Sequence, residues 1–259
     1  MTTVYDSSYY QRQIQGSLQS ARVVAPIVMD LFSPRSVVDV GCGHGTWLCA
    51  FQEQNVSDML GIDGDYIDVN EMVIPLDCFK SFDLTAPLDL GRTFDLALSL
   101  EVAEHIPPTS AEVFVASICK LAPVVLFSAA IPSQSGTGHI NLQWPHYWHE
   151  LFARHGYHAF DPIRHKIWHD SRVEWWYRQN IYVYVHGAAL QQGKFSRIMP
   201  FALEADPFTL IKTSLVNDNM NSAAVRAIDD LGLRATLKRS FALIRNMLRA
   251  RIKRFLSAR

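Results

Sequence analysis

A β-branched run followed by three glycines on alternate positions is the feature that most constrains this chain. Residues 37–40 (VVDV) lead directly into residues 41–45 (GCGHG). Such a run is typical of a buried parallel strand, and glycines allow a tight turn into the following helix with no side chain in the way. A ligand can then lie against bare backbone at the N-terminus of that helix. The pattern predicts an α/β fold with a ligand site after its first strand.

Two further acids follow at regular distances. Asp63 ends the apolar run 59–63, 24 residues after Asp39, and Asp83 comes another 20 residues along. An acid at the end of the second strand can accept hydrogen bonds from both hydroxyls of a ribose. The glycine spacing is G-x-G-x-G, which differs from the G-x-G-x-x-G pattern of dinucleotide-binding folds. A nucleoside-containing cofactor other than NAD is therefore favoured.

These elements resemble motif I and the following strands of the class I S-adenosylmethionine (SAM) methyltransferases. Residues 94–101 resemble motif IV of that family, and the resemblance extends over residues 20–187. It implies a Rossmann-like seven-stranded sheet with helices on both faces. The fifth strand is expected at 124–128, after a helix near 110–121. The last two strands are expected near 157–163 and 180–186, after a helix over 144–155.

The resemblance also implies which residues surround SAM. The glycine loop packs under the methionine part, Asp63 binds the ribose, and Asp83 lies near the adenine amino group. The expected cofactor-binding residues are Asp39, Gly41, Cys42, Gly43, Gly45, Asp63, Gly64, Asp83, Leu84 and Leu100.

The segment after the fourth strand carries residues suited to a divalent metal. Glu101, Glu104 and His105 stand at positions i, i+3 and i+4, which project on one side of a helical turn. Carboxylates and imidazole suit a hard or borderline divalent ion such as Mg²⁺. In two groups of similar methyltransferases, which act on ubiquinone precursors and on small RNAs, the matching residues hold magnesium. In many other family members this pattern is structural.

His139 is the fourth candidate ligand. It precedes Gln143 and Trp144 much as a metal-binding histidine precedes Glu-Trp in the small-RNA enzymes, although the residue type and the spacing differ. Without a metal, His139 or His105 is a candidate general base, since histidine titrates near neutrality. A loop histidine bonded to the backbone is the alternative. The histidines between 146 and 169 lack thiolate partners and ligand spacing, so no zinc site is expected there.

Composition excludes several other classes of protein. The 259 residues are 49% hydrophobic and 19% charged, which is ordinary for a globular chain. No uncharged apolar run reaches membrane-spanning length, and the first residues show no signal-peptide pattern. The four cysteines form no CxxC pair and are expected to be buried thiols in a reducing compartment. We expect a cytoplasmic protein.

The charge is unevenly distributed. Nine Lys or Arg and no Asp or Glu follow Asp230, which leaves 15 basic and 25 acidic side chains in residues 1–230, a net charge of −10. The basic residues flank an apolar stripe at helical spacing, so residues 231–259 are expected to form a basic amphipathic helix. It is a candidate for peripheral contact with anionic lipid at the inner membrane face, for docking to an acidic partner, for contact with nucleic acid, or for packing on its own core.

Four segments are expected. Residues 1–35 form an N-terminal helical segment that either covers the cofactor as a lid or lies on the surface. Residues 36–188 form the methyltransferase domain, residues 189–230 a linker or cover, and residues 231–259 the basic helix.

The function expected from these features is SAM-dependent O-methylation of a hydroxyl on a small molecule or glycan. The chain resembles bacterial methyltransferases of surface-polysaccharide and secondary-metabolite pathways through 99–107 (SLEVAEHIP), 138–145 (GHINLQWP) and 173–180 (VEWWYRQN). RNA 2′-O-methylation is an alternative, which the acidic body of the chain disfavours. Small-molecule N-methylation, which requires no metal, and a non-catalytic SAM-fold module that docks through its C-terminal helix are further alternatives.

Overall fold

The computed structural model describes residues 7–193 and 195–203, with side chains from residue 14 onward. Seven strands form one sheet in the order β3-β2-β1-β4-β5-β7-β6. The strands are β1 (Ser36–Val40), β2 (Asp58–Asp63), β3 (Phe79–Ser81), β4 (Leu96–Leu100), β5 (Val124–Ser128), β6 (Tyr157–Phe160) and β7 (Tyr182–His186). This confirms the seven-stranded Rossmann-like methyltransferase sheet.

The first five strands are parallel, and β7 runs antiparallel to both β5 and β6. β1, β4 and β5 are almost wholly buried, as expected for parallel strands that helices cover on both faces. The chain order reverses between β1 and β4. Open α/β sheets bind ligands at the carboxyl edge beside such a reversal.

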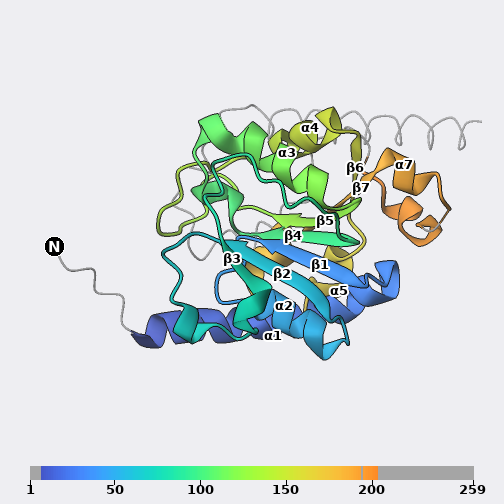
Figure 1. Cartoon of the computed structure of the whole chain (residues 1–259). Coiled ribbons are helices and arrows are strands. Elements are labelled where there is room, and N and C mark those ends of the chain that lie inside the picture. Colours follow the sequence, from blue (N-terminus) through green and yellow to red (C-terminus); the bar gives the residue numbers. More distant parts are fainter. Residues whose placement is uncertain (1–6, 194, 204–259) are drawn as a thin grey trace, which may run out of the picture.

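Helices cover both faces of the sheet (Figure 1). α1 (Ser7–Phe32), α2 (Thr46–Glu53) and α5 (Arg164–Ile167) lie on one face, and α3 (Ala111–Leu121) and α4 (Pro145–Arg154) lie on the other. The remaining elements are α6 (Trp175–Asn180), α7 (Gly187–Leu190) and the short 3-10 turns η1 (Val69–Glu71), η2 (Leu76–Cys78), η3 (Ala103–His105), η4 (Pro108–Ser110) and η5 (Ser196–Phe201). None of the helices in the described ranges is long and apolar enough to cross a membrane.

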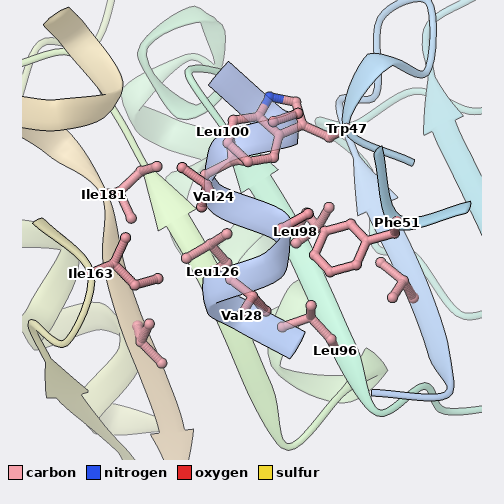
Figure 2. Close-up of a cluster of buried hydrophobic side chains, with 14 of the residues drawn as sticks. Val24, Val28, Trp47, Phe51, Leu96, Leu98, Leu100, Leu126, Ile163 and Ile181 are labelled. Carbon is pink, nitrogen blue, oxygen red and sulfur yellow. The ribbon is translucent and has the colours of Figure 1, made fainter. Parts of the chain in front are cut away.

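The described side chains of α1 belong to the core. Val24 and Val28 are fully buried and pack over Leu98 and Leu126 of the central strands (Figure 2). Apolar burial of this extent stabilises a domain by about 25 cal/mol per Å² of surface removed from water. Residues 14–32 are thus an integral layer of the domain. Whether the first residues act as a lid stays a prediction.

Residues 195–203 pack back onto the domain. Ile198 is fully buried, and the Leu203 amide donates to the Ala159 carbonyl at 3.0 Å, beside a bridge between Phe160 and Ala202. The described part of the predicted linker is therefore a cover over β6. The predicted basic helix, 231–259, lies outside the described residues.

Candidate active site

The glycine loop leaves β1 with three left-handed residues. Gly41, Gly43 and Gly45 have φ values of +88°, +52° and +85°. A Cβ at Gly41 would lie 2.3 Å from the Val102 side chain, and one at Gly45 would lie 2.7 Å from Ile74. A Cβ at Gly43 would meet nothing within 4 Å. Gly41 and Gly45 therefore permit close packing within the protein, whereas Gly43 presents bare backbone to an open face.

Asp63 faces this loop from the end of β2. Its carboxylate accepts hydrogen bonds from the Gly43 amide (2.7 Å), the Gly64 amide (2.7 Å) and the Tyr66 hydroxyl (2.5 Å). The side chain is only 4% exposed. The structure thus brings Asp63, Gly43 and Gly64 together, although they come from two separate connections.

Asp39 in β1 and Cys42 in the loop both have buried side chains. Burial raises the pKa of Asp39 to about 7, and the charge of Asp63 adds to the effect. Burial also raises the pKa of the Cys42 thiol far above its usual range, so this thiol is not a nucleophile at neutral pH. The Gly41 and Cys42 amides both donate to the Ile62 carbonyl, which ties the loop to β2.

The other predicted SAM neighbours are distributed along the same edge. Asp83 is exposed, and its carboxylate accepts from the Thr85 amide (2.9 Å) and hydroxyl (2.7 Å), which lowers its pKa. Leu84 and Leu100 are 9% and 7% exposed and pack in the two core clusters. Contact of Asp83 with adenine remains a prediction.

Glu101 adopts a conformation that the sequence did not reveal. Its φ is +57°, and its amide donates to the Ser128 carbonyl (3.0 Å) and hydroxyl (3.1 Å). Its carboxylate accepts from Gln134 Nε2 at 3.0 Å and Asn180 Nδ2 at 3.2 Å. The left-handed backbone prevents a helical turn from running from Glu101 to Glu104. The predicted i, i+3, i+4 arrangement is therefore not formed.

Glu104, His105 and His139 do converge. Each offers one ligand atom, and these atoms lie within 4.8 Å of one another. Glu104 is 1% exposed, and neither of its carboxylate oxygens makes a well-formed hydrogen bond, although the Ala130 amide and the Glu101 carboxyl group lie close to it. His139 Nε2 lies 4.0 Å from Glu104 Oε1. Glu101 is not among these three residues, and Gln134 and Asn180 hold its carboxylate next to Glu104. The predicted four-residue ligand set stays a prediction.

The two carboxyl groups share a low-dielectric site. Burial raises the pKa of Glu101, and burial together with the charge of Glu101 raises the pKa of Glu104 well above its usual value. A buried carboxylate with so few donors is costly unless a cation or a proton compensates it.

Backbone carbonyls fix the tautomers of both histidines. His105 Nδ1 lies 3.2 Å from the Gly138 carbonyl, and His139 Nδ1 lies 3.3 Å from the Gln134 carbonyl. A carbonyl oxygen only accepts, so each Nδ1 carries the proton and each Nε2 keeps its lone pair. Desolvation lowers the pKa of both rings, and for His139 the charge of His105 adds to the effect. Both imidazoles are therefore neutral donors of an electron pair at neutral pH.

Three residues of the site were missed from the sequence. Gln134 lies in a loop expected at this edge, but nothing indicated its partner. Asn180 was assigned to the last strand and instead ends α6, where its amide reaches Gln134 Oε1 at 3.0 Å. Tyr66 carried no signal at all. In the described residues, the cluster of metal-ligating groups includes no histidine from the stretch after 146.

Comparisons with known proteins agree with this geometry. Residues 10–180, more than half of the chain, match the model of a family described as "Methyltransferase domain". A comparison with proteins of curated function found no significant match.

Three similar solved structures have TM-scores above 0.5. The sugar N-methyltransferase KedS8 from Streptoalloteichus is 15% identical, with a TM-score of 0.54 over 72% of this chain and 97% of that one. DesVI from Streptomyces venezuelae is 16% identical, with a TM-score of 0.51 over 69% of this chain and 95% of that one. The amino pentose methyltransferase CalS10 from Micromonospora echinaspora is 15% identical, with a TM-score of 0.51 over 72% of this chain and 99% of that one. At such identities the likeness concerns the fold. With its family match, sheet order and glycine loop, the chain belongs to the methyltransferase-domain family and is a SAM-dependent methyltransferase.

Proposed function

We propose that this methyltransferase transfers the methyl group of SAM to a hydroxyl of a small molecule or glycan, with a divalent metal ion held by Glu104, His105 and His139. One observation carries the proposal. The Glu104 carboxylate is buried and makes no well-formed hydrogen bond, since only its own amide and the Ala130 amide approach it as donors, and two neutral imidazoles lie beside it.

The residues present fit a divalent cation. A carboxylate and two imidazole Nε2 atoms are suitable ligands, and three protein ligands leave coordination positions for other oxygens. The backbone carbonyls that hold each Nδ1–H orient the rings, which is the usual arrangement around histidine ligands. When bound, the ion would supply Lewis acidity that lowers the pKa of an acceptor hydroxyl.

Methyl transfer itself requires orientation and one proton removal. The acceptor oxygen attacks the methyl carbon, the carbon–sulfur bond breaks, and its electron pair remains on sulfur. The hydroxyl proton must leave. With a metal bound, His139 Nε2 would be a ligand, and the ion would lower the pKa of the hydroxyl so that its proton can pass to solvent. Without a metal, the neutral His139 Nε2 is the base. An amine acceptor would need no such group at the moment of attack.

The cofactor contacts proposed from the sequence are consistent with the loop geometry. Asp63 binds the ribose, Gly43 allows close approach of the cofactor to the backbone, and Asp83 lies toward the adenine. Leu100 closes the site at the end of β4.

A sugar is the preferred acceptor, because KedS8 is described as a sugar N-methyltransferase and CalS10 as an amino pentose methyltransferase. The same relatives make N-methylation of an amino sugar the second candidate. RNA is disfavoured by the net charge of −10 before residue 231. Membrane contact through residues 231–259 is a separate proposal, tested by pelleting with anionic vesicles with and without that segment.

The first experiment is incorporation of label from SAM into sugar, amino-sugar and RNA pools by the full chain, with and without EDTA. We expect label on a hydroxyl, lost with EDTA and restored by a divalent ion. Glu104→Gln should lower turnover by at least about 100-fold and leave the affinity for S-adenosylhomocysteine (SAH) unchanged. His146→Gln is the matched control, because His146 is exposed and pairs with Glu150 outside the cluster.

Other outcomes would overturn parts of the proposal. Labelling that is indifferent to EDTA would remove the metal and leave His139 as the base. Label on nitrogen would favour the second candidate, and label in RNA would reject the acceptor class.

A further inference from the structure

Asp63 already has three hydrogen-bond donors in this structure. Oδ2 accepts from the Gly43 amide, and Oδ1 accepts from both the Gly64 amide and the Tyr66 hydroxyl. Two donors on Oδ1 fill the two lone-pair directions of that oxygen. A ribose that presents two hydroxyls to this carboxylate needs an acceptor position on each oxygen. One donor on Oδ1 therefore has to leave.

The Tyr66 hydroxyl is the donor that can leave. The two amides belong to the backbone at the end of β2 and in the glycine loop, where displacement would disturb the fold. The Tyr66 hydroxyl belongs to a side chain, and the residue is 77% exposed. Tyr66 lies in a turn in which the Ile67 amide donates to the Gly64 carbonyl.

The ring lies against backbone on its way to Asp63. A Cβ at Gly64 would stand 2.1 Å from the Tyr66 ring, so only glycine at position 64 admits this placement. The phenol therefore reaches the carboxylate by passing over Gly64.

We infer that Tyr66 sets the affinity of the enzyme for its cofactor, because its hydroxyl takes the position on Asp63 that a ribose hydroxyl requires. This inference rests on the proposed role of Asp63. The phenol and the ribose are competitors, and each cofactor molecule that binds must first displace the phenol. Apparent affinity then falls in proportion to the fraction of protein in which Asp63 is free.

The test measures SAH affinity by calorimetry in the full chain and in Tyr66→Phe, which keeps the ring and removes only the donor. We expect Tyr66→Phe to bind SAH about 3- to 10-fold more tightly, the range for loss of one partly exposed competing hydrogen bond. An SAH analogue that lacks both ribose hydroxyls supplies the matched control. It does not need Asp63, so its affinity should be the same for both proteins.

A second variant separates competition from a general effect of the ring. In an Asp63→Asn background, Tyr66→Phe should give a much smaller gain, because the shared acceptor has been altered. A merely structural role of Tyr66 would alter the affinity for SAH and for the deoxy analogue alike.

Two results would overturn the inference. Unchanged or weaker SAH binding by Tyr66→Phe would show that the hydroxyl does not compete, and an equal gain for the deoxy analogue would place the effect outside Asp63. Failure of the full chain to bind SAH at all would instead reject the cofactor assignment, which is a distinguishable outcome.

Discussion

Two buried carboxylates at the same edge of the sheet differ in their hydrogen bonding. On the proposed cofactor side, Asp63 accepts three hydrogen bonds, two of them from the backbone. On the proposed acceptor side, Glu104 is even less exposed but makes no well-formed hydrogen bond, and its own amide and the Ala130 amide are the donors nearby. The first carboxylate therefore helps to hold the loop around it, whereas the second depends mainly on a proton or a bound cation for compensation. The cofactor side should respond to mutation through stability and cofactor affinity, and the acceptor side through turnover.

Gly136→Ala is the strongest test of whether a change near Glu104 and His139 affects turnover and not stability. The new Cβ would lie 2.1 Å from the His139 ring, so the ring must move away from the Gln134 carbonyl. Displacement of a reacting group by about 1 Å costs on the order of 100-fold in rate. We expect turnover to fall by at least about that factor, with thermal stability and SAH affinity unchanged. Ser135→Ala, an exposed neighbour, is the control. A large loss of stability in Gly136→Ala would contradict the contrast.

On the cofactor side, Gly45→Ala should act through stability. Its φ of +85° and the 2.7 Å approach to Ile74 together make alanine costly, and we expect a loss of about 3 kcal/mol or more in free energy of unfolding. Gly43→Ala has only the backbone penalty of about 1–2 kcal/mol, because its Cβ meets nothing. It should instead weaken SAH binding, since the methyl group projects into the open face. Denaturant unfolding and calorimetry check both, and equal stability losses would reject the distinction.

The two sides also differ in how far the sequence could predict them. Gly43 and Asp63 were both expected at the ligand edge, because neighbouring connections of a parallel sheet meet there, and the structure joins them by a hydrogen bond. The position of Glu101 could not be predicted, because a positive φ in a non-glycine residue leaves no periodic signal. The partners of its carboxylate, Gln134 and Asn180, are 46 residues apart, and their meeting depends on tertiary packing.

The same reasoning applies to the fold. The family resemblance implied seven strands, six of them recognisable as apolar runs, and all seven are present. The last two were predicted longer than they are, since β6 ends at Phe160 and β7 begins at Tyr182. Apolar content alone does not predict the residue at which the hydrogen-bonded strand ends. The helix α6 in between depends on tertiary contacts of Tyr177, which receives the Trp47 indole hydrogen bond at 3.4 Å.

The buried acid beneath the glycine loop gives the cofactor side a pH dependence. The pKa of Asp39 is raised to about 7 in the folded chain by burial and by Asp63, so the folded chain binds more protons than the unfolded chain above about pH 4. This contribution to stability is fully present below about pH 4 and is lost as the pH rises through 7.

Asp39→Asn should remove that contribution. Between about pH 5 and pH 7, the free energy of unfolding of the wild type should fall by about 2 kcal/mol relative to the variant. Denaturant titrations across this range provide the measurement, and Asp65→Asn, at an exposed position after β2, should follow the wild type. If the free energy of unfolding changed with pH equally in Asp39→Asn and the wild type, the pH dependence would come from a group other than Asp39.

The smallest expected effect separates the two sides most cleanly, because it compares two equally exposed apolar side chains. Ile140 is 58% exposed and follows His139, and its amide and that of Asn141 both donate to the Glu104 carbonyl. Leu76 is 59% exposed and lies in η2, on the connection that follows β2. An acceptor that reaches the cluster should pass over Ile140 but not over Leu76.

Ile140→Ala should therefore raise the KM for the acceptor about 3- to 10-fold, the value of a lost apolar contact of about 1 kcal/mol, and leave SAH affinity as it is. Leu76→Ala should change neither the acceptor KM nor kcat. Steady-state kinetics with the acceptor found in the labelling experiment measure both. If Leu76→Ala raises the acceptor KM as much as Ile140→Ala does, the acceptor lies across both sides of the edge. The division between a cofactor side and an acceptor side would then have to be abandoned.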